Sequence, residues 1–282
     1  MIKANLHSHS HFCDGKAPME AMVQSAIDKE FSILGISSHA PVPIKNHFAI
    51  STDNQLRDYC REVSHLQDKF KNDIELYLSL EIDYIPEITR SFEYFNRICN
   101  LDYAIGSVHL VRNGTNERLW FIDGPDAGIY DRGLKEVFNG DIIKAVTAYY
   151  HQINEMITTQ KPDMVGHIDK VKMHNKNRYF TEDETWYTRL IDETLDYLRA
   201  NNCVMEVNTR GIYKGRTAAL FPGEMILKKA VDLGIPVSLN SDAHHPDDMD
   251  GYYSEAMKIL NNIGFKEMHY FHKGQWKAFP LE

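Results

Sequence analysis

The stretch "NLHSHSHFCDG", residues 5–15, places three histidines at alternating positions and ends in Asp-Gly. Residues 2–7 are predicted to form a short apolar strand, and side chains two apart on a strand point to the same face. His7 and His9 would therefore lie side by side, about 6–7 Å apart along the strand. A solvated histidine-rich terminus or a leftover purification tag is the alternative. Because an apolar stretch leads in and a turn follows, the segment favours metal ligands.

The composition limits the class of protein and of partner. The chain of 282 residues is long enough for one barrel-sized domain or for two smaller ones. Its hydrophobic content of 43% and charged content of 25% are typical of globular proteins. The formal net charge of -9, without a basic stripe, argues against a nucleic-acid polymer as partner. A small anionic substrate remains compatible, because bound metal ions can supply positive charge locally.

The cysteines are scattered and include no CxxC pair, which predicts neither a disulfide framework nor a thiolate zinc site. They are Cys13, Cys60, Cys99 and Cys203. Reduced thiols in a cytoplasmic protein are the expectation. No signal peptide is visible, and no apolar stretch approaches the roughly 18 residues of a membrane span. A membrane partner is therefore not expected.

Short apolar runs alternate with longer amphipathic ones along the chain. The runs predicted as strands are 2–7, 32–38, 75–83, 102–108, 163–167, 203–208 and 235–240. The patterns predicted as helices are 18–30, 53–70, 87–99, 141–160, 182–201, 222–233 and 252–263. Repeated units of this kind predict parallel strands wrapped by helices into a barrel. No linker divides the chain, so residues 1–282 are expected to form a single domain, and 269–279 a final strand or hairpin.

One connection, residues 110–140, is long and shows no strong periodic element. It exceeds a routine βα loop, so it is a candidate lid or substrate-binding loop. Trp120 and Phe121 within it either cover an imidazole ring or anchor the loop to the core.

Metal-capable side chains close nearly every predicted strand. They are His39, Glu81, His109, His167, Glu206, Asn208, Asp242 and His244. The C-terminal strand ends of such a barrel surround one mouth, so these residues should converge there. One such histidine alone is often an ordinary polar group, whereas their repetition favours a shared site. Mixed imidazole and carboxylate ligands suit zinc, iron or manganese. A carboxylate such as Glu81 can bridge two metals, which together activate a water.

The order of these motifs resembles the polymerase and histidinol phosphatase (PHP) superfamily. "IGSVH", "VGHIDKVK", "EVNTRG" and "GIPVSLNSDAHHPDDM" look most like its monofunctional histidinol-phosphate phosphatases. The resemblance covers the whole chain. It implies a distorted (β/α)7 TIM-like barrel with three divalent transition-metal ions, Zn, Mn or Fe, at the C-terminal ends of the strands.

The resemblance also implies which residues hold each ion. The first ion takes His7, His9, Glu81 and Asp242. The second takes Glu81, His109 and His167. The third takes Asp14, His39 and His244. His11 lies just outside this set and is interpreted as a supporting or solvent-facing residue.

Basic residues follow the sixth predicted strand in "NTRGIYKGR", residues 208–216. Arg210, Lys214 and Arg216 there either clamp a phosphate or form a solvated basic loop. Asp169 in "GHID" either orients His167 or caps the next helix.

The resemblance implies a metal-dependent phosphomonoesterase that releases L-histidinol and phosphate from L-histidinol phosphate in histidine biosynthesis. Glu81, Arg210 and Asp242 are the expected catalytic residues, and no covalent phosphoenzyme is expected because no nucleophile motif is visible. Two alternatives stay open. One is a PHP phosphoesterase acting on nucleotides or nucleic-acid ends, and the other is a non-catalytic metal-binding scaffold. The oligomeric state is left open.

Overall fold

The alternating apolar runs form one parallel sheet in a computed structural model that describes residues 2–114 and 118–281. Neighbouring strands follow the order β1-β2-β3-β4-β7-β8-β9. These strands are β1 (Ala4–Asn5), β2 (Ile33–Ile36), β3 (Glu75–Asp83), β4 (Tyr103–Ser107), β7 (Met164–Val165), β8 (Val204–Asn208) and β9 (Val237–Asn240). Every pair of neighbours in this order is parallel, as crossover connections through helices require.

The first and last strands of this order approach each other and nearly close the sheet into a barrel. Ser8 and Ala243 form an isolated parallel bridge between the two edges. The backbone N–H of Leu6 donates to Asn240 Oδ1 at 2.7 Å, and that of His9 donates to the Ala243 carbonyl at 2.8 Å. The predicted distorted (β/α)7 barrel is confirmed.

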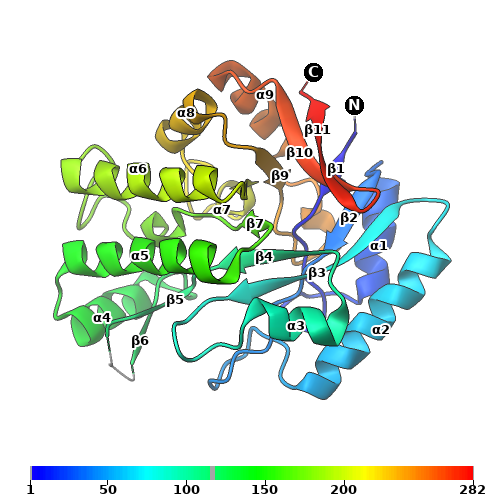
Figure 1. Cartoon of the computed structure of the whole chain (residues 1–282), viewed down its shortest axis with the longest axis horizontal. Helices are drawn as coiled ribbons and strands as arrows, with labels where there is room; N and C mark the ends of the chain where they lie inside the picture. Colours follow the sequence, from blue (N-terminus) through cyan, green and yellow to red (C-terminus); the bar gives the residue numbers. More distant parts are fainter. Residues whose placement is uncertain (1, 115–117, 282) are drawn as a thin grey trace.

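Helices surround the sheet (Figure 1). They are α1 (Met19–Asp28), α2 (Asp53–Lys69), α3 (Phe92–Cys99), α4 (Ala127–Phe138), α5 (Ile142–Gln160), α6 (Thr185–Ala200), α7 (Arg210–Tyr213), α8 (Glu224–Leu233) and α9 (Tyr253–Ile263). Their starts and stops follow local chemistry. Thr52 caps α2 by accepting from the backbone N–H of Gln55, and Gly234 ends α8 with a left-handed φ of 65°. Their buried faces join the strands in one large apolar core.

The segment 110–140 is more regular than predicted. It contains an antiparallel hairpin of β5 (Leu110–Arg112) and β6 (Leu119–Phe121), followed by α4. Trp120 is fully buried and its Nε1–H donates to the Tyr130 carbonyl at 2.9 Å, so this residue anchors the segment. The prediction of no strong periodic element was wrong, because the buried residues of α4, Tyr130, Leu134, Val137 and Phe138, recur at helical spacing. Residues 115–117 lie outside the described residues.

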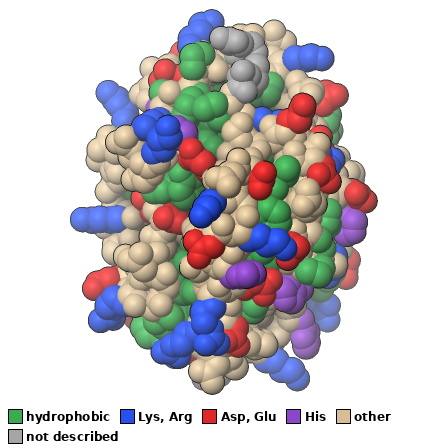
Figure 2. All heavy atoms as spheres, turned by 90° about the vertical axis from the view of Figure 1, so that its right-hand side faces the viewer, with side chains coloured by type: hydrophobic (Ala, Val, Ile, Leu, Met, Phe, Trp, Pro, Cys, Tyr) green, Lys and Arg blue, Asp and Glu red, His purple; other side chains and the backbone are tan. Residues whose placement is uncertain are grey.

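The C-terminal residues form a hairpin, which confirms one of the two predicted forms. Strand β10 (Glu267–His272) pairs antiparallel with β11 (Gln275–Pro280) across a turn in which Lys273 and Gly274 both have positive φ. The hairpin lies near β1 in Figure 1. Acidic and basic side chains are interspersed on the face shown in Figure 2. Among the described residues, every helix is too short or too polar to span a bilayer.

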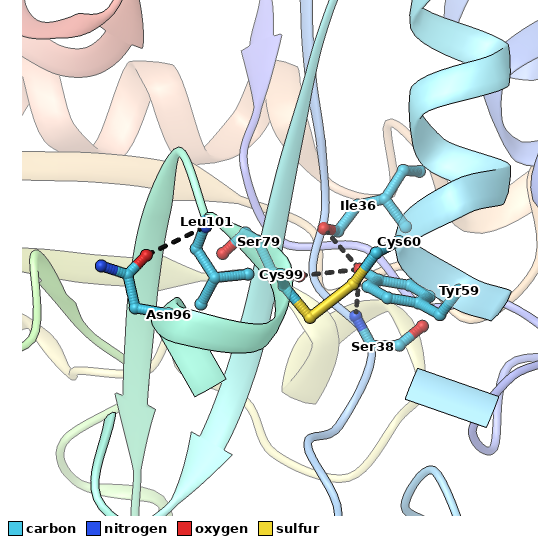
Figure 3. The surroundings of a disulfide bond; sticks show 8 residues. All are labelled: Ile36, Ser38, Tyr59, Cys60, Ser79, Asn96, Cys99 and Leu101. Atoms are coloured by element: carbon cyan, nitrogen blue, oxygen red, sulfur yellow. Dashed lines mark hydrogen bonds between the residues drawn. A yellow bond between two sulfur atoms is a disulfide. The ribbon is translucent and has the colours of Figure 1, made fainter. Parts of the chain in front are cut away.

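Cys60 on α2 and Cys99 on α3 form a disulfide, with their Cα atoms 5.8 Å apart (Figure 3). The expectation of four reduced thiols was therefore wrong for this pair, while Cys13 and Cys203 are free. A separation of 39 residues gives no sign of the pairing, which depends on how the two helices pack. The neighbouring Tyr59 hydroxyl lies within hydrogen-bond distance of the backbone of both β2 and β3.

Candidate metal centre

The strand ends bring the predicted ligands into one cluster, called here the metal centre. Its members are His7, His9, Asp14, His39, Glu81, His109, His167, Asp242 and His244. All are buried except Asp14, whose side chain is 31% exposed. The barrel therefore gathers residues that are spread over more than 230 positions of sequence.

Glu81 lies in the middle of the metal centre, and its two oxygens face different histidines. Its Oε1 atom is 3.0 Å from His167 Nε2 and 3.4 Å from His109 Nε2. Its Oε2 atom is 3.1 Å from His7 Nε2 and 3.2 Å from His39 Nδ1. This division is the geometry that a carboxylate shared by two ions needs.

Two pairs of imidazoles point ring nitrogens at each other. His7 Nε2 is 3.1 Å from His9 Nε2, and His109 Nε2 is 3.3 Å from His167 Nε2. Within the described chain, Asp14 Oδ1 and other buried polar atoms of the cluster have no hydrogen-bond partner. Buried atoms of this kind are normally satisfied, so a cation between them fits the donor set.

Potential ligand atoms cluster into groups in which all lie within 4.8 Å of one another. The groups are His7, His9 and Asp242; Glu81, His109 and His167; His9, Asp14, His39 and His244; and His39, Asp83 and His109. The first three correspond closely to the three ligand sets that the family resemblance implied. Clusters able to hold metal ions are thus present among the described residues.

Two buried carboxylates hold histidines of the metal centre in place. Glu206 was predicted only as one of the metal-capable residues at the strand ends, and Asp83 had no predicted role. Glu206 Oε1 lies 2.6 Å from His7 Nδ1, and its Oε2 accepts from the backbone N–H of His167 at 2.9 Å. Asp83 Oδ1 accepts from the backbone N–H and Nδ1 of His109 at 3.0 and 2.9 Å. Carboxylates at these positions fix ring orientation and tautomer. Period-two spacing from Glu81 could have identified Asp83.

The charges of the metal centre are strongly coupled. Burial alone would raise the pKa of Glu81, but the surrounding imidazoles of His39, His7 and His109 hold it well below its usual range. Burial lowers the pKa of His109, but Asp83, Asp123 and Glu81 outweigh it and raise the value to about 10. The carboxylates around His109 therefore favour its charged form in the protein without metal.

Two members of the metal centre have left-handed backbone conformations that side chains other than glycine rarely adopt. His167 has a φ of 23° and Asp242 a φ of 53°. Each such residue costs about 1–3 kcal/mol, and strain of this kind gathers at functional sites. The strained backbone at these two positions places both side chains in the metal centre.

A cavity of about 500 Å³ opens over the metal centre. Lys45, Lys170, Arg210 and Arg216 line it. Lys170 Nζ lies 3.2 Å from Asp123 Oδ2, and no pattern in the sequence indicated this pair. Arg210 Nη1 donates to the Asp242 carbonyl at 2.8 Å.

Other predicted site residues are placed differently. Lys214 is not among the residues lining the cavity, because its Nζ pairs with Asp248 at 2.8 Å. Asp169 neither orients His167 nor caps the next helix. Its Oδ2 atom contacts Lys172 Nζ at 2.7 Å and accepts from the Gly223 N–H, at the start of α8.

Comparison with known families agrees with this geometry. A model of the PHP domain matches residues 5–210, which is more than half of the chain. The chain belongs to the PHP domain family. The matched range begins at the HxH segment and ends at Arg210, so it contains most of the metal centre.

Curated relatives and solved structures match over most of the chain. The histidinol-phosphatase of Bacillus subtilis is 26% identical over 91% of this chain and 98% of its own length. The DNA polymerase/3'-5' exonuclease PolX of the same organism is 21% identical over 96% of this chain but only 41% of its own length. The histidinol phosphate phosphatase of Lactococcus lactis, solved with Zn, L-histidinol and phosphate, shares the fold with a TM-score of 0.69. It is 20% identical and covers 98% of each chain.

Proposed function

We propose that this protein is a histidinol-phosphatase, which hydrolyses L-histidinol phosphate to L-histidinol and phosphate. The observation that carries the proposal is the complete metal centre beneath a cavity lined by basic side chains. The nearly full-length likeness to the Bacillus subtilis histidinol-phosphatase supports this substrate. The solved Lactococcus lactis relative binds both products named here.

The metal centre would hold three divalent ions, with zinc, manganese and iron as the candidates for this donor set. His7, His9, Glu81 and Asp242 would form the first site, and Glu81, His109 and His167 the second. Asp14, His39 and His244 would form the third. When bound, the ions would supply charge neutralisation for the phosphate and acidify the attacking water.

Basic side chains of the cavity would bind the phosphate oxygens. Arg210 is held against the Asp242 carbonyl and offers a planar set of N–H donors that matches phosphate. Lys170 and Arg216 line the same cavity and would add positive charge near the developing negative charge. Lys214 has no part in this arrangement because of its pairing with Asp248.

The two alternative functions fit the chain less well. The alternative of a phosphoesterase acting on nucleotides or nucleic-acid ends is supported by the likeness to PolX. PolX is longer, however, and this chain spans less than half of it. The net charge of -9 and the interspersed charges in Figure 2 do not favour a polyanion. A non-catalytic scaffold would not need the complete ligand set.

A single cytoplasmic domain, with residues 110–140 as a lid, is part of the same proposal.

The experiment is phosphate release by the metal-loaded protein across L-histidinol phosphate, nucleoside monophosphates and 4-nitrophenyl phosphate. The proposal predicts the highest kcat/KM with L-histidinol phosphate. A preference for nucleotides would support the PHP phosphoesterase alternative, and no release from any ester would support the scaffold.

A further inference from the structure

The cavity over the metal centre is also lined by apolar side chains, which the proposed chemistry does not use. Ile44, Phe48, Leu110 and Phe121 line it. The centroids of the Phe48 and Phe121 rings are 6.1 Å apart, with an angle of 35° between the planes. Both rings are half-buried, and we call these two side chains the aromatic wall. An apolar surface beside a charged centre is costly to expose to water, so it points to a ligand with an apolar part.

The fold builds this wall from two separate segments. Asn46 Oδ1 accepts from the backbone N–H groups of Phe48 and Ala49 at 3.2 and 2.9 Å, and its Nδ2 donates to the Ile44 carbonyl at 2.9 Å. The Phe48 ring then packs edge-on against His39 with centroids 5.3 Å apart. Phe121 comes from β6 and is the register partner of Leu110 on β5. Both rings are therefore held by backbone structure and are pre-formed for binding.

Asp123 lies two residues beyond Phe121 and lines the same cavity. Its side chain is only 10% exposed, and its Oδ2 atom pairs with Lys170 Nζ at 3.2 Å. Its Oδ1 atom is buried and has no hydrogen-bond partner within the described residues. A buried carboxylate oxygen without a partner is unfavourable, and a cationic group of a ligand would satisfy it.

We propose that the aromatic wall and Asp123 form the binding site for the leaving alcohol, with the ring against Phe48 and Phe121 and the ammonium on Asp123. This inference rests on the proposed function, because the metal centre then takes the phosphate of the same ester. The site selects phosphomonoesters whose alcohol carries both a planar ring and a cation. L-histidinol has both groups.

The test compares three esters that separate the two groups. L-histidinol phosphate carries a ring and an ammonium, phosphoethanolamine only the ammonium, and phenyl phosphate only the ring. In Phe121→Leu, the ratio of kcat/KM for L-histidinol phosphate over phosphoethanolamine should fall about tenfold, because leucine keeps an apolar contact but loses ring–ring stacking. In Asp123→Asn, the ratio of kcat/KM for L-histidinol phosphate over that for phenyl phosphate should fall at least tenfold, because the amide no longer offers a charged partner to the ammonium. Tyr179→Leu, a surface aromatic 40% exposed and outside the cavity lining, is the matched control with unchanged ratios.

Phe48→Leu repeats the ring test, with metal content measured because Phe48 packs on His39. If Phe121→Leu leaves the ratio over phosphoethanolamine unchanged, or Asp123→Asn leaves the ratio over phenyl phosphate unchanged, the proposed site for the leaving alcohol is wrong. If the wild-type protein hydrolyses phenyl phosphate but not L-histidinol phosphate, the proposed function fails. In that case the aromatic wall still predicts that Phe121→Leu lowers the ratio of kcat/KM for phenyl phosphate over that for phosphoethanolamine. Calorimetric binding of L-histidinol to the metal-loaded variants gives the same comparison without turnover.

Discussion

Glu206 Oε1 lies 2.6 Å from Nδ1 of His7, and the opposite ring nitrogen of His7 faces Glu81 Oε2 at 3.1 Å. The proton on the Nδ1 side is therefore held by Glu206, which leaves Nε2 free to face a cation. The same carboxylate also accepts from the backbone of His167. One residue thus positions members of two of the proposed metal sites.

Replacing Glu206 with glutamine should weaken metal binding by about 10–100-fold, because the amide lacks the charge that fixes His7 and raises its basicity. Zinc affinity measured by competition with a chromophoric chelator tests this. Glu224→Gln changes an exposed carboxylate on α8 and is the control. Equal zinc affinity in wild type and Glu206→Gln would show that Glu206 has no role in positioning.

Glu81→Ala should remove activity more completely than the loss of any single histidine of the metal centre. Its two oxygens face separate groups of histidines, so its loss would disrupt two proposed sites at once. The comparison is turnover of Glu81→Ala against His39→Ala at saturating metal. If Glu81→Ala keeps more than about a tenth of wild-type turnover, the carboxylate does not join two ions.

Arg210→Ala should lower kcat/KM for phosphate esters about 10²-fold and leave metal content unchanged, because it removes a charge-assisted phosphate contact. Arg210→Lys keeps the charge but not the planar fork, so it should recover only part of the loss. Lys214→Ala is the control, because Lys214 pairs with Asp248 outside the cavity lining. Wild-type kinetics in both Arg210 variants would place the phosphate contact elsewhere, at Lys170 or Arg216.

The Cys60–Cys99 disulfide should leave two thiols open to alkylation in the unfolded, unreduced protein and four after reduction, by mass spectrometry. Cys60→Ser should lower the free energy of unfolding by up to about 4 kcal/mol, which is the chain-entropy value for a loop of this length. Dithiothreitol should destabilise the wild type and leave Cys60→Ser unaffected. Alkylation of four thiols without reductant would contradict the pairing.

Hydrophobic periodicity predicted most of the fold. Strand β3 matches the predicted range 75–83, because its residues between Glu75 and Asp83 are apolar except for Ser79 and Glu81. Strands β1 and β7 are only two residues long, shorter than predicted. The length of a parallel ladder depends on neighbouring strands that one segment of sequence does not specify.

The candidate site was partly predictable for the same reason. Residues at strand ends converge in a barrel, so the gathering of the proposed ligands followed from the predicted strands. Asp123, Phe48 and the disulfide did not follow, because their positions depend on how loops and helices pack in three dimensions. The assignment of the ligands to ions remains a prediction, with about three transition-metal ions per chain expected by elemental analysis.

The measurement that tests the central claim most directly is phosphate release from L-histidinol phosphate before and after chelation. The account predicts that a strong chelator abolishes release, and that adding zinc, manganese or iron back restores it. Full release by the chelated protein, or no release with any of these metals at full occupancy, would contradict the account.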